Sequence, residues 1–336
     1  MPSKSPVVLT PGEPAGIGPE ISAKAWQQVH SEPKCCFALL YDISALRHRL
    51  AQAGINVPVA EIEALDQATQ TFSKALPVLH RPMPLVPHAG SFNPANSPWV
   101  IKAIEEAIDL CLAGNASAMV TNPIQKEALY AAGFAHRGHT DFLAAAARKK
   151  GHEAHDVMML VGGGLRAVPV TVHIPLKDVV SHLTQRTIET QARVVHAALQ
   201  SYFGISSPRI AIAGLNPHAG ENGTMGREEI EIIIPAIKRL RAEGLNVAGP
   251  LPADTAFFPE ARKTYDAILC MYHDQALIPV KTLDFHGGVN VTLGLPFTRT
   301  SPDHGTALDL AGTGKAQAES LVAALRLAVD MAGNAN

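Results

Sequence analysis

The sequence predicts an α/β protein built on mainly parallel sheets. Short apolar stretches alternate with longer ones in which apolar residues recur at helical spacing, a pattern typical of parallel strands joined by helices. Residues 267–271 are the clearest strand, because Ala-Ile-Leu-Cys-Met is apolar at every position, as in a strand buried on both faces. The 336 residues are enough for two domains or for one large α/β body.

The expected strands lie at Val7–Thr10, Cys36–Tyr41, Ala118–Thr121, Val157–Val161, Arg166–Val172, Ile210–Leu215, Ala267–Met271 and Val289–Gly294. Three glycines at 162–164 indicate a hairpin between the fourth and the fifth. Two other stretches are expected to lack regular structure. They are the proline-dense residues 77–98 and the polar turn Arg299–Pro302.

The helices are expected at residues 19–29, 43–53, 97–112, 124–129, 141–150, 187–203, 227–243 and 316–331. Asp42 is a suitable N-cap for the second helix, and Gly114 follows the end of the third. Pro19 suits the first turn of the first helix, where Glu20 favours the positive end of the helix dipole.

Composition excludes several classes of protein. The net charge of −2 gives no overall basic field, and 47% hydrophobic with 17% charged residues is ordinary for a soluble enzyme. The most apolar window, residues 157–176, is interrupted by glycines, Arg166 and His173, so no membrane span is expected. Four cysteines without a C-x-x-C pair are typical of free thiols in a reducing compartment. We therefore expect a cytoplasmic protein that binds neither nucleic acid nor membrane.

Three histidines each follow an expected strand: His173, His218 and His273. The carboxyl ends of strands in open α/β sheets cluster in space and are where ligands bind. Three neutral imidazoles could hold zinc or a similar ion and leave a coordination position open for a substrate oxygen. A single histidine is more often an ordinary core or surface residue, so the metal interpretation depends on the three converging.

Other polar groups in loops could bind an anion such as phosphate or carboxylate. They are His139, Thr140, Lys281 and Arg299. Residues 137–141 stand at an expected helix start, where backbone N–H groups attract anions, and a guanidinium can bind them in a bidentate way. The alternative is a helix cap with solvated charges around it.

Two glycine-rich loops, residues 11–20 and 303–314, come without a nucleotide fingerprint. Gly16 and Gly18 permit close backbone approach, so the first loop could line a ligand cleft or form a tight turn between strand and helix. The second loop does not match G-x-G-x-x-G after a first strand, and the chain has no P-loop.

Five short motifs along the chain together resemble those of a known family. They are GEPAGIGPE at 12–20, GHT at 138–140, VHIPL at 172–176, NPHAGE at 216–221 and YHDQ at 272–275. Together they resemble the PdxA family, the 4-hydroxythreonine-4-phosphate dehydrogenases of vitamin B6 synthesis. Glu13 stands where the family usually has aspartate, which keeps the charge and lengthens the side chain.

The resemblance implies the two-domain fold of isocitrate and isopropylmalate dehydrogenases, with mainly parallel sheets and the active site in the interdomain cleft. Residues 1–125 with 285–336 would form the first domain, which carries the cofactor loop. Residues 126–284 would form the second domain, with the metal ligands and the dimer interface. The resemblance also implies a homodimer whose active site is shared between subunits.

The resemblance implies a role for each matching residue. A divalent metal (Zn²⁺, Mg²⁺ or Co²⁺) would be bound by His173, His218 and His273. The substrate would be contacted by His139, Thr140, Lys281, Asn290 and Arg299. The second glycine-rich loop is similar to the adenosine-binding loop of isocitrate dehydrogenases and would contact NAD or NADP through His304, Gly305, Thr306, Asp309 and Gly312. The general base stays open between Lys281, Asp274 and a metal-bound water.

The implied reaction is the NAD(P)-dependent oxidation of 4-phosphohydroxy-L-threonine at its C3 hydroxyl. The product, 2-amino-3-oxo-4-phosphooxybutanoate, loses carbon dioxide to give 3-amino-2-oxopropyl phosphate, a precursor of pyridoxal 5′-phosphate. One alternative is a dehydrogenase of another phosphorylated four-carbon acid, D-threonate or D-erythronate 4-phosphate. The other is an acyltransferase of the related phosphotransacetylase-like fold, which needs no three-histidine metal site.

Overall fold

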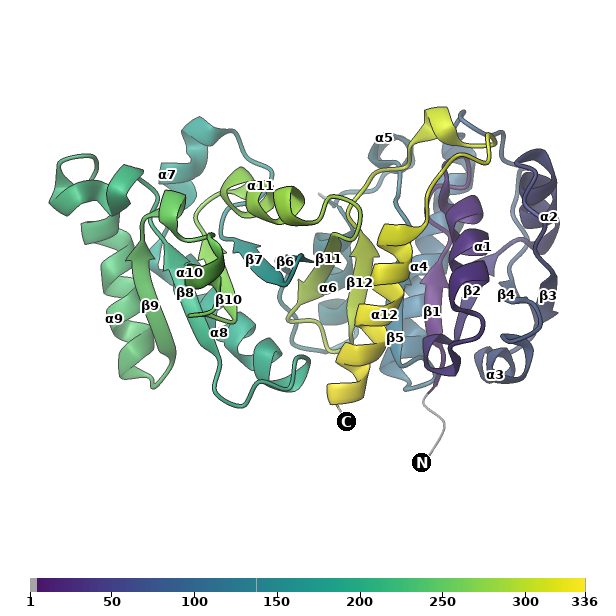
Figure 1. Cartoon of the computed structure of the whole chain (residues 1–336). Helices are drawn as coiled ribbons and strands as arrows, with labels where there is room; N and C mark the ends of the chain where they lie inside the picture. The colour runs from purple at the N-terminus through teal and green to yellow at the C-terminus, as the bar shows by residue number, and fades with distance from the viewer. Residues whose placement is uncertain (1–4, 137, 336) are drawn as a thin grey trace. The chain divides into compact units, whose positions relative to one another are not determined.

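The computed structural model of the chain describes residues 5–136 and 138–335, which divide into two units. The first unit comprises residues 5–156, apart from Arg137, together with 295–334. The second unit is Val157–Gly294. Each contains one sheet with helices packed on it, and Figure 1 identifies the elements by label.

The strands of the first unit are β1 (Val7–Thr10), β2 (Phe37–Tyr41), β3 (Val59–Ile62), β4 (Leu76–His80), β5 (Ala118–Thr121) and β12 (Arg299–Pro302). They lie in the order β3-β4-β2-β1-β5-β12, and every neighbouring pair is parallel. The helices are α1 (Gly18–Val29), α2 (Ile43–Gln52), α3 (Ala68–Thr71), α4 (Ser97–Leu112), α5 (Lys126–Ala131), α6 (His139–Lys149) and α12 (Glu319–Asn334). Helix α12 packs on β12, β5 and α1 (Figure 1).

The strands of the second unit are β6 (Val157–Gly162), β7 (Leu165–Pro169), β8 (Arg209–Ala213), β9 (Asn246–Leu251), β10 (Ala267–Cys270) and β11 (Val289–Leu293). In the order β11-β6-β7-β10-β8-β9, the pairs on either side of β6 are antiparallel and the others are parallel. The helices are α7 (Val179–His182), α8 (Gln185–Ser201), α9 (Ile234–Ala242), α10 (Pro259–Arg262) and α11 (His273–Leu283).

The prediction of a mainly parallel α/β fold is therefore confirmed. The apolar run after Asp266 forms β10, where Ile268 and Leu269 are completely buried. Burial of one such side chain contributes about 1.5–3 kcal/mol, which is why an uninterrupted apolar run predicts a central strand so well. The three-glycine hairpin is also confirmed, because β6 and β7 pair antiparallel across it.

Two expectations about irregular stretches are wrong. Residues 76–80 form β4, since Val78 and Leu79 are buried between β2 and β3 and the denser prolines begin only at Pro82. Arg299–Pro302 is not a polar turn but the buried strand β12. Two of its polar side chains find partners inside the unit: Arg299 Nη2 donates to Thr121 Oγ1, and Thr300 Oγ1 donates to the Ala324 carbonyl at 2.8 Å.

The units divide at 156/157 and 294/295, whereas the sequence placed the divisions at 125/126 and 284/285. Helices α5 and α6 stay with the first unit because both pack against α4. Strand β11 stays with the second unit because it pairs with β6. Among the described residues, no helix is both long and apolar enough to cross a membrane.

Candidate active site

Two of the predicted metal ligands, His173 and His273, lie together in the second unit. Their ring centroids are 5.4 Å apart, with 42° between the ring planes. The two histidines follow the ends of the neighbouring parallel strands β7 and β10. Just beyond these strands, the Thr171 hydroxyl donates to the Met271 carbonyl at 2.8 Å. Each histidine then follows two residues later. Neighbouring strand ends thus bring these two histidines, distant in the sequence, into one place.

Asp274 orients one of these imidazoles. Nδ1 of His273 and Oδ1 of Asp274 are 2.7 Å apart. This bond favours the tautomer with its hydrogen on Nδ1, which leaves the lone pair of Nε2 available for an ion. The carboxylate predicted as a possible general base is therefore engaged as a partner of His273.

His218, the third predicted ligand, sits in an unusual turn. Residues 218–222 all have positive φ, from 42° to 80°, and form a left-handed turn in which Gly220 is the one glycine. The His218 side chain is 63% exposed, with Nδ1 3.8 Å from Oε2 of Glu221. Within the described residues of one chain, no three His, Cys, Asp or Glu side chains are grouped to hold an ion. That His218 shares an ion with the other two histidines stays a prediction.

Glu229 holds the left-handed turn in place. Its carboxylate is almost completely buried and accepts the backbone N–H groups of Leu215 and Asn216, both at 2.8 Å. It also accepts the Asn216 side-chain amide at 2.9 Å. A Cβ on Gly220 would lie 2.4 Å from the same carboxylate, so glycine is required there. Sequence reasoning missed Glu229, because within Arg227-Glu228-Glu229 it reads as part of a solvated helix start.

The predicted anion-binding residues His139 and Arg299 lie in the first unit. Arg299, on β12, is 2% exposed, and its Nη2 donates to Thr121 Oγ1 at the end of β5. Burial lowers the pKa of Arg299 to about 9, so the guanidinium stays protonated at neutral pH. A protonated guanidinium inside a mostly apolar unit is well suited to an anionic ligand.

His139 stands beside these charges as a neutral group. It is the first residue of α6, followed by Thr140, and its Nε2 is buried without a hydrogen-bond partner among the described residues. Burial, with the positive charges of Arg299 and Lys126, lowers its pKa well below the usual value. His139 can therefore donate or accept a hydrogen bond at neutral pH, while Arg299 and Lys126 supply charge. Lys126 was missed by sequence reasoning, although it closely follows the Thr121-Asn122-Pro123 strand end.

Lys281 and Asn290 belong to the second unit. Lys281 lies two turns after His273 on α11, and both residues line a hollow of about 430 Å³ along that helix. Residues four apart on a helix lie on the same face, so Lys281, eight residues after His273, lies on the same face of α11. Asn290, on β11, has a buried side-chain oxygen with no hydrogen-bond partner among the described residues. An unsatisfied buried amide oxygen is available to a ligand donor.

The predicted cofactor loop lies between β12 and α12. Nε2 of His304 is buried without a partner in the described part of the chain, and a Cβ on Gly305 would meet nothing within 4 Å. The unsatisfied ring nitrogen of His304 is available to a ligand. Thr306 is turned towards its own unit, with Oγ1 3.3 Å from Gln125 Oε1. Asp309 is in the single 3₁₀ turn Leu308–Leu310, and the N–H of Gly312 donates to Glu20.

Comparisons with known proteins agree on one family. The model of "Pyridoxal phosphate biosynthetic protein PdxA" matches residues 33–328. The 4-hydroxythreonine-4-phosphate dehydrogenase of Methylorubrum populi is 52% identical over 97% of this chain and 94% of that protein. The enzyme of the same name from Bradyrhizobium diazoefficiens is 49% identical over 97% of each.

Solved structures resemble the chain along its whole length. The crystal structure of 4-hydroxythreonine-4-phosphate dehydrogenase from Klebsiella pneumoniae superposes with a TM-score of 0.86 at 38% identity, covering 98% of both chains. A terephthalate 1,2-cis-dihydrodiol dehydrogenase from Burkholderia xenovorans gives 0.65 at 29% identity, covering 97% of this chain and 98% of that one. A branched-chain phosphotransacylase from Enterococcus faecalis, at 0.53 and 15% identity over 97% and 99%, shares the fold alone.

Proposed function

The chain belongs to the PdxA family of pyridoxal phosphate biosynthetic proteins, and from this premise we propose that it is a 4-hydroxythreonine-4-phosphate dehydrogenase. The observation that carries the proposal is near-full-length identity of about half to enzymes of that name, with a polar side chain at each predicted metal-binding and substrate-binding position. The substrate would be 4-phosphohydroxy-L-threonine and the hydride acceptor NAD or NADP.

The proposed reaction has two balanced steps. The C3–H bond breaks and its electron pair passes as hydride to the nicotinamide, while the C3 hydroxyl loses its proton to a base. The bond to the carboxylate of the 3-oxo acid then breaks, and its electron pair passes towards the ketone oxygen. Carbon dioxide leaves, a proton adds to carbon, and the product is 3-amino-2-oxopropyl phosphate.

Residues of the first unit would bind the charged end of the substrate. Arg299 would form charge-assisted hydrogen bonds to phosphate, and the first turn of α6 would add neutral donors from His139 and Thr140. Charged hydrogen bonds of this kind contribute about 1.5–3 kcal/mol each, enough to fix the orientation of a small substrate. From the second unit, Asn290 would meet a substrate donor with its buried oxygen.

The second unit would supply the metal-binding histidines and the base. His173 and His273 fit a divalent ion such as Zn²⁺, Mg²⁺ or Co²⁺, with Asp274 orienting one of them. When bound, the ion supplies Lewis-acid stabilisation of negative charge on the substrate oxygen. Because Asp274 is engaged in this way, Lys281 is the proposed base.

A homodimer would complete the site. Helix α11 exposes apolar side chains beside His273, including Ile278 (63% exposed) and Phe285 just after the helix (71%). Exposed apolar residues grouped in this way are typical of an interface. The exposed His218 of a second copy could then join the pair of the first. Such a shared site explains how three ligands that are not grouped within one chain could meet.

Turnover of 4-phosphohydroxy-L-threonine tests the proposal. Purified protein would be assayed with NAD and with NADP, before and after chelation, and after return of Zn²⁺, Mg²⁺ or Co²⁺. Metal-dependent formation of NAD(P)H and carbon dioxide is expected. A large preference for D-threonate or D-erythronate 4-phosphate would replace the substrate assignment. Acyl transfer that survives exhaustive chelation would favour the phosphotransacetylase-like alternative.

A further inference from the structure

Two glycine-rich loops of the first unit lie against each other. Because α1 begins at Gly18, the first loop comprises residues 11–17 in the structure, and we name residues 303–316 the His304 loop. The N–H of Ile17 donates to the Thr306 carbonyl at 3.1 Å. A Cβ on Gly16 would stand 2.9 Å from that same carbonyl oxygen, so the close approach requires glycine. Whatever fixes the position of one loop therefore bears on the other.

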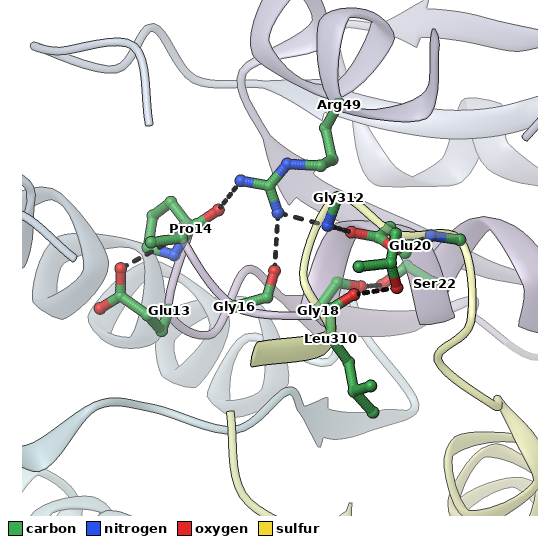
Figure 2. Close-up of polar contacts among 12 residues, drawn as sticks. Glu13, Pro14, Gly16, Gly18, Glu20, Ser22, Arg49, Leu310 and Gly312 are labelled. Atoms are coloured by element: carbon green, nitrogen blue, oxygen red, sulfur yellow. Dashed lines mark hydrogen bonds and ion pairs between the residues drawn. The ribbon is translucent and has the colours of Figure 1, made fainter. Parts of the chain in front are cut away.

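Glu20 holds the His304 loop from α1. Its carboxylate is completely buried and accepts the N–H of Gly312 at 2.5 Å (Figure 2). It also accepts the N–H of Gly314 at 3.3 Å. Both glycines have positive φ, 78° and 67°, so the loop turns back at each of them. The carboxylate thus binds the two backbone positions at which the loop changes direction.

Arg49 holds the first loop from α2. Its guanidinium is 1% exposed and donates to the carbonyls of Gly16 at 2.8 Å and Pro14 at 3.1 Å, as Figure 2 shows. Its Nη1 lies 3.7 Å from Oε1 of Glu20. A buried ion pair therefore joins Arg49, which binds the first loop, to Glu20, which binds the His304 loop.

Lys24, one turn after Glu20 on α1, also binds the His304 loop. Its ammonium donates to the carbonyls of Gly314 at 2.6 Å and Ala316 at 2.7 Å. Gly314 is thus held at its N–H by Glu20 and at its carbonyl by Lys24. The spacing of four residues on one helix face makes this double contact possible.

We infer that the Glu20–Arg49 pair, with Lys24, positions the His304 loop for the dinucleotide and so sets cofactor affinity. This inference rests on the proposed function, in which that loop contacts NAD(P). A buried ion pair is a weak source of stability, because well-packed apolar residues often replace it without loss. What the pair supplies here is one defined loop conformation. Without it the binding-competent conformation is only a fraction of the population, and apparent affinity falls by that fraction.

The test separates positioning from stability. The double variant Glu20→Met/Arg49→Met removes both members of the ion pair together, so neither is left as an unpaired charge. Lys24→Met removes the two hydrogen bonds of the ammonium group to the His304 loop and leaves the Glu20–Arg49 ion pair intact. The matched control is Glu32→Gln, which breaks the exposed contact between Glu32 and Arg326 in the same unit, away from both loops. The readouts are direct NADH and NADPH binding by fluorescence titration, Tm, and KM for cofactor and substrate with kcat.

The double variant is expected to raise the cofactor Kd and KM at least ~10-fold, while substrate KM and saturated kcat change less than ~3-fold. Lys24→Met is expected to shift the same constants in the same direction by less, and Glu32→Gln not at all. Wild-type affinity in folded Lys24→Met and in a folded double variant would overturn the inference. So would a lowered Tm with unchanged cofactor Kd, or failure of the double variant to fold with Lys24→Met at wild-type affinity. Wild-type protein that binds neither dinucleotide would overturn the cofactor assignment itself, and the inference with it.

Discussion

Removal of the Glu229 carboxylate should release the left-handed turn that carries His218. Four non-glycine residues in that turn have positive φ, and the left-handed region is unfavourable by about 1–2 kcal/mol for each, or about 4–8 kcal/mol in all. Glu229, itself buried, offsets this with three part-buried hydrogen bonds of 2.8–2.9 Å. Since charged hydrogen bonds contribute about 1.5–3 kcal/mol each, the two sums are similar. The turn should therefore relax once the carboxylate is gone.

Glu229→Ala is expected to lower the free energy of unfolding by about 3–5 kcal/mol, because two part-buried backbone N–H groups and the Asn216 side chain lose a charged acceptor. Urea unfolding measures this. Glu228→Ala is the matched control: Glu228 is half-buried and accepts a hydrogen bond from the Asn216 side chain, which keeps Glu229 as a partner. The control should lose less than about 1 kcal/mol.

The same two variants test whether the turn that carries His218 affects metal binding. Titration with Co²⁺, followed by its visible absorption, should show binding at least ~10-fold weaker in Glu229→Ala than in wild type, while Glu228→Ala stays close to wild type. A loss of stability below about 1 kcal/mol would show that the carboxylate is not what holds the turn. Unchanged Co²⁺ affinity in the destabilised variant would refute the link between the turn and the ion.

Three further results are expected. His218→Ala should lose bound metal and activity with its assembly unchanged in sedimentation, and a fully active variant would remove His218 from the site. Because the pKa of His139 is lowered on folding, the unfolded chain takes up the proton first, so stability should fall as pH drops below about 6.5. Tm measured against pH should have a shallower slope in His139→Asn, and equal slopes would contradict the shift. Phe285→Asp should weaken a homodimer in sedimentation, whereas Leu85→Asp, an exposed control in the first unit, should not.

Strands with an apolar sequence could be predicted, but strands with buried polar side chains could not. Residues 267–270 can be predicted as a strand from their composition. Arg299–Pro302 has the composition of a turn, yet it is a buried strand in which Thr121 accepts a hydrogen bond from Arg299 and Ala324 accepts one from Thr300. Those partners are far away in the sequence. No local pattern contains them.

The same limit applies to the site. His173 and His273 could be paired from the sequence because each follows a strand, and strand ends cluster. Glu20 was expected to interact with a helix dipole, but its carboxylate instead accepts N–H groups almost 300 residues away. Carboxylates that bind backbone donors leave no complementary charge elsewhere in the sequence by which to recognise them.

The discontinuous first unit sets an order of events during synthesis. Strand β12 and helix α12 supply part of its sheet and core, yet they leave the ribosome only after the whole of Val157–Gly294. The second unit is a single continuous segment and can complete its own core while translation continues. Nascent chains should therefore acquire protease resistance in residues 157–294 before residues 5–156, an inversion of the usual N-terminal-first sequence.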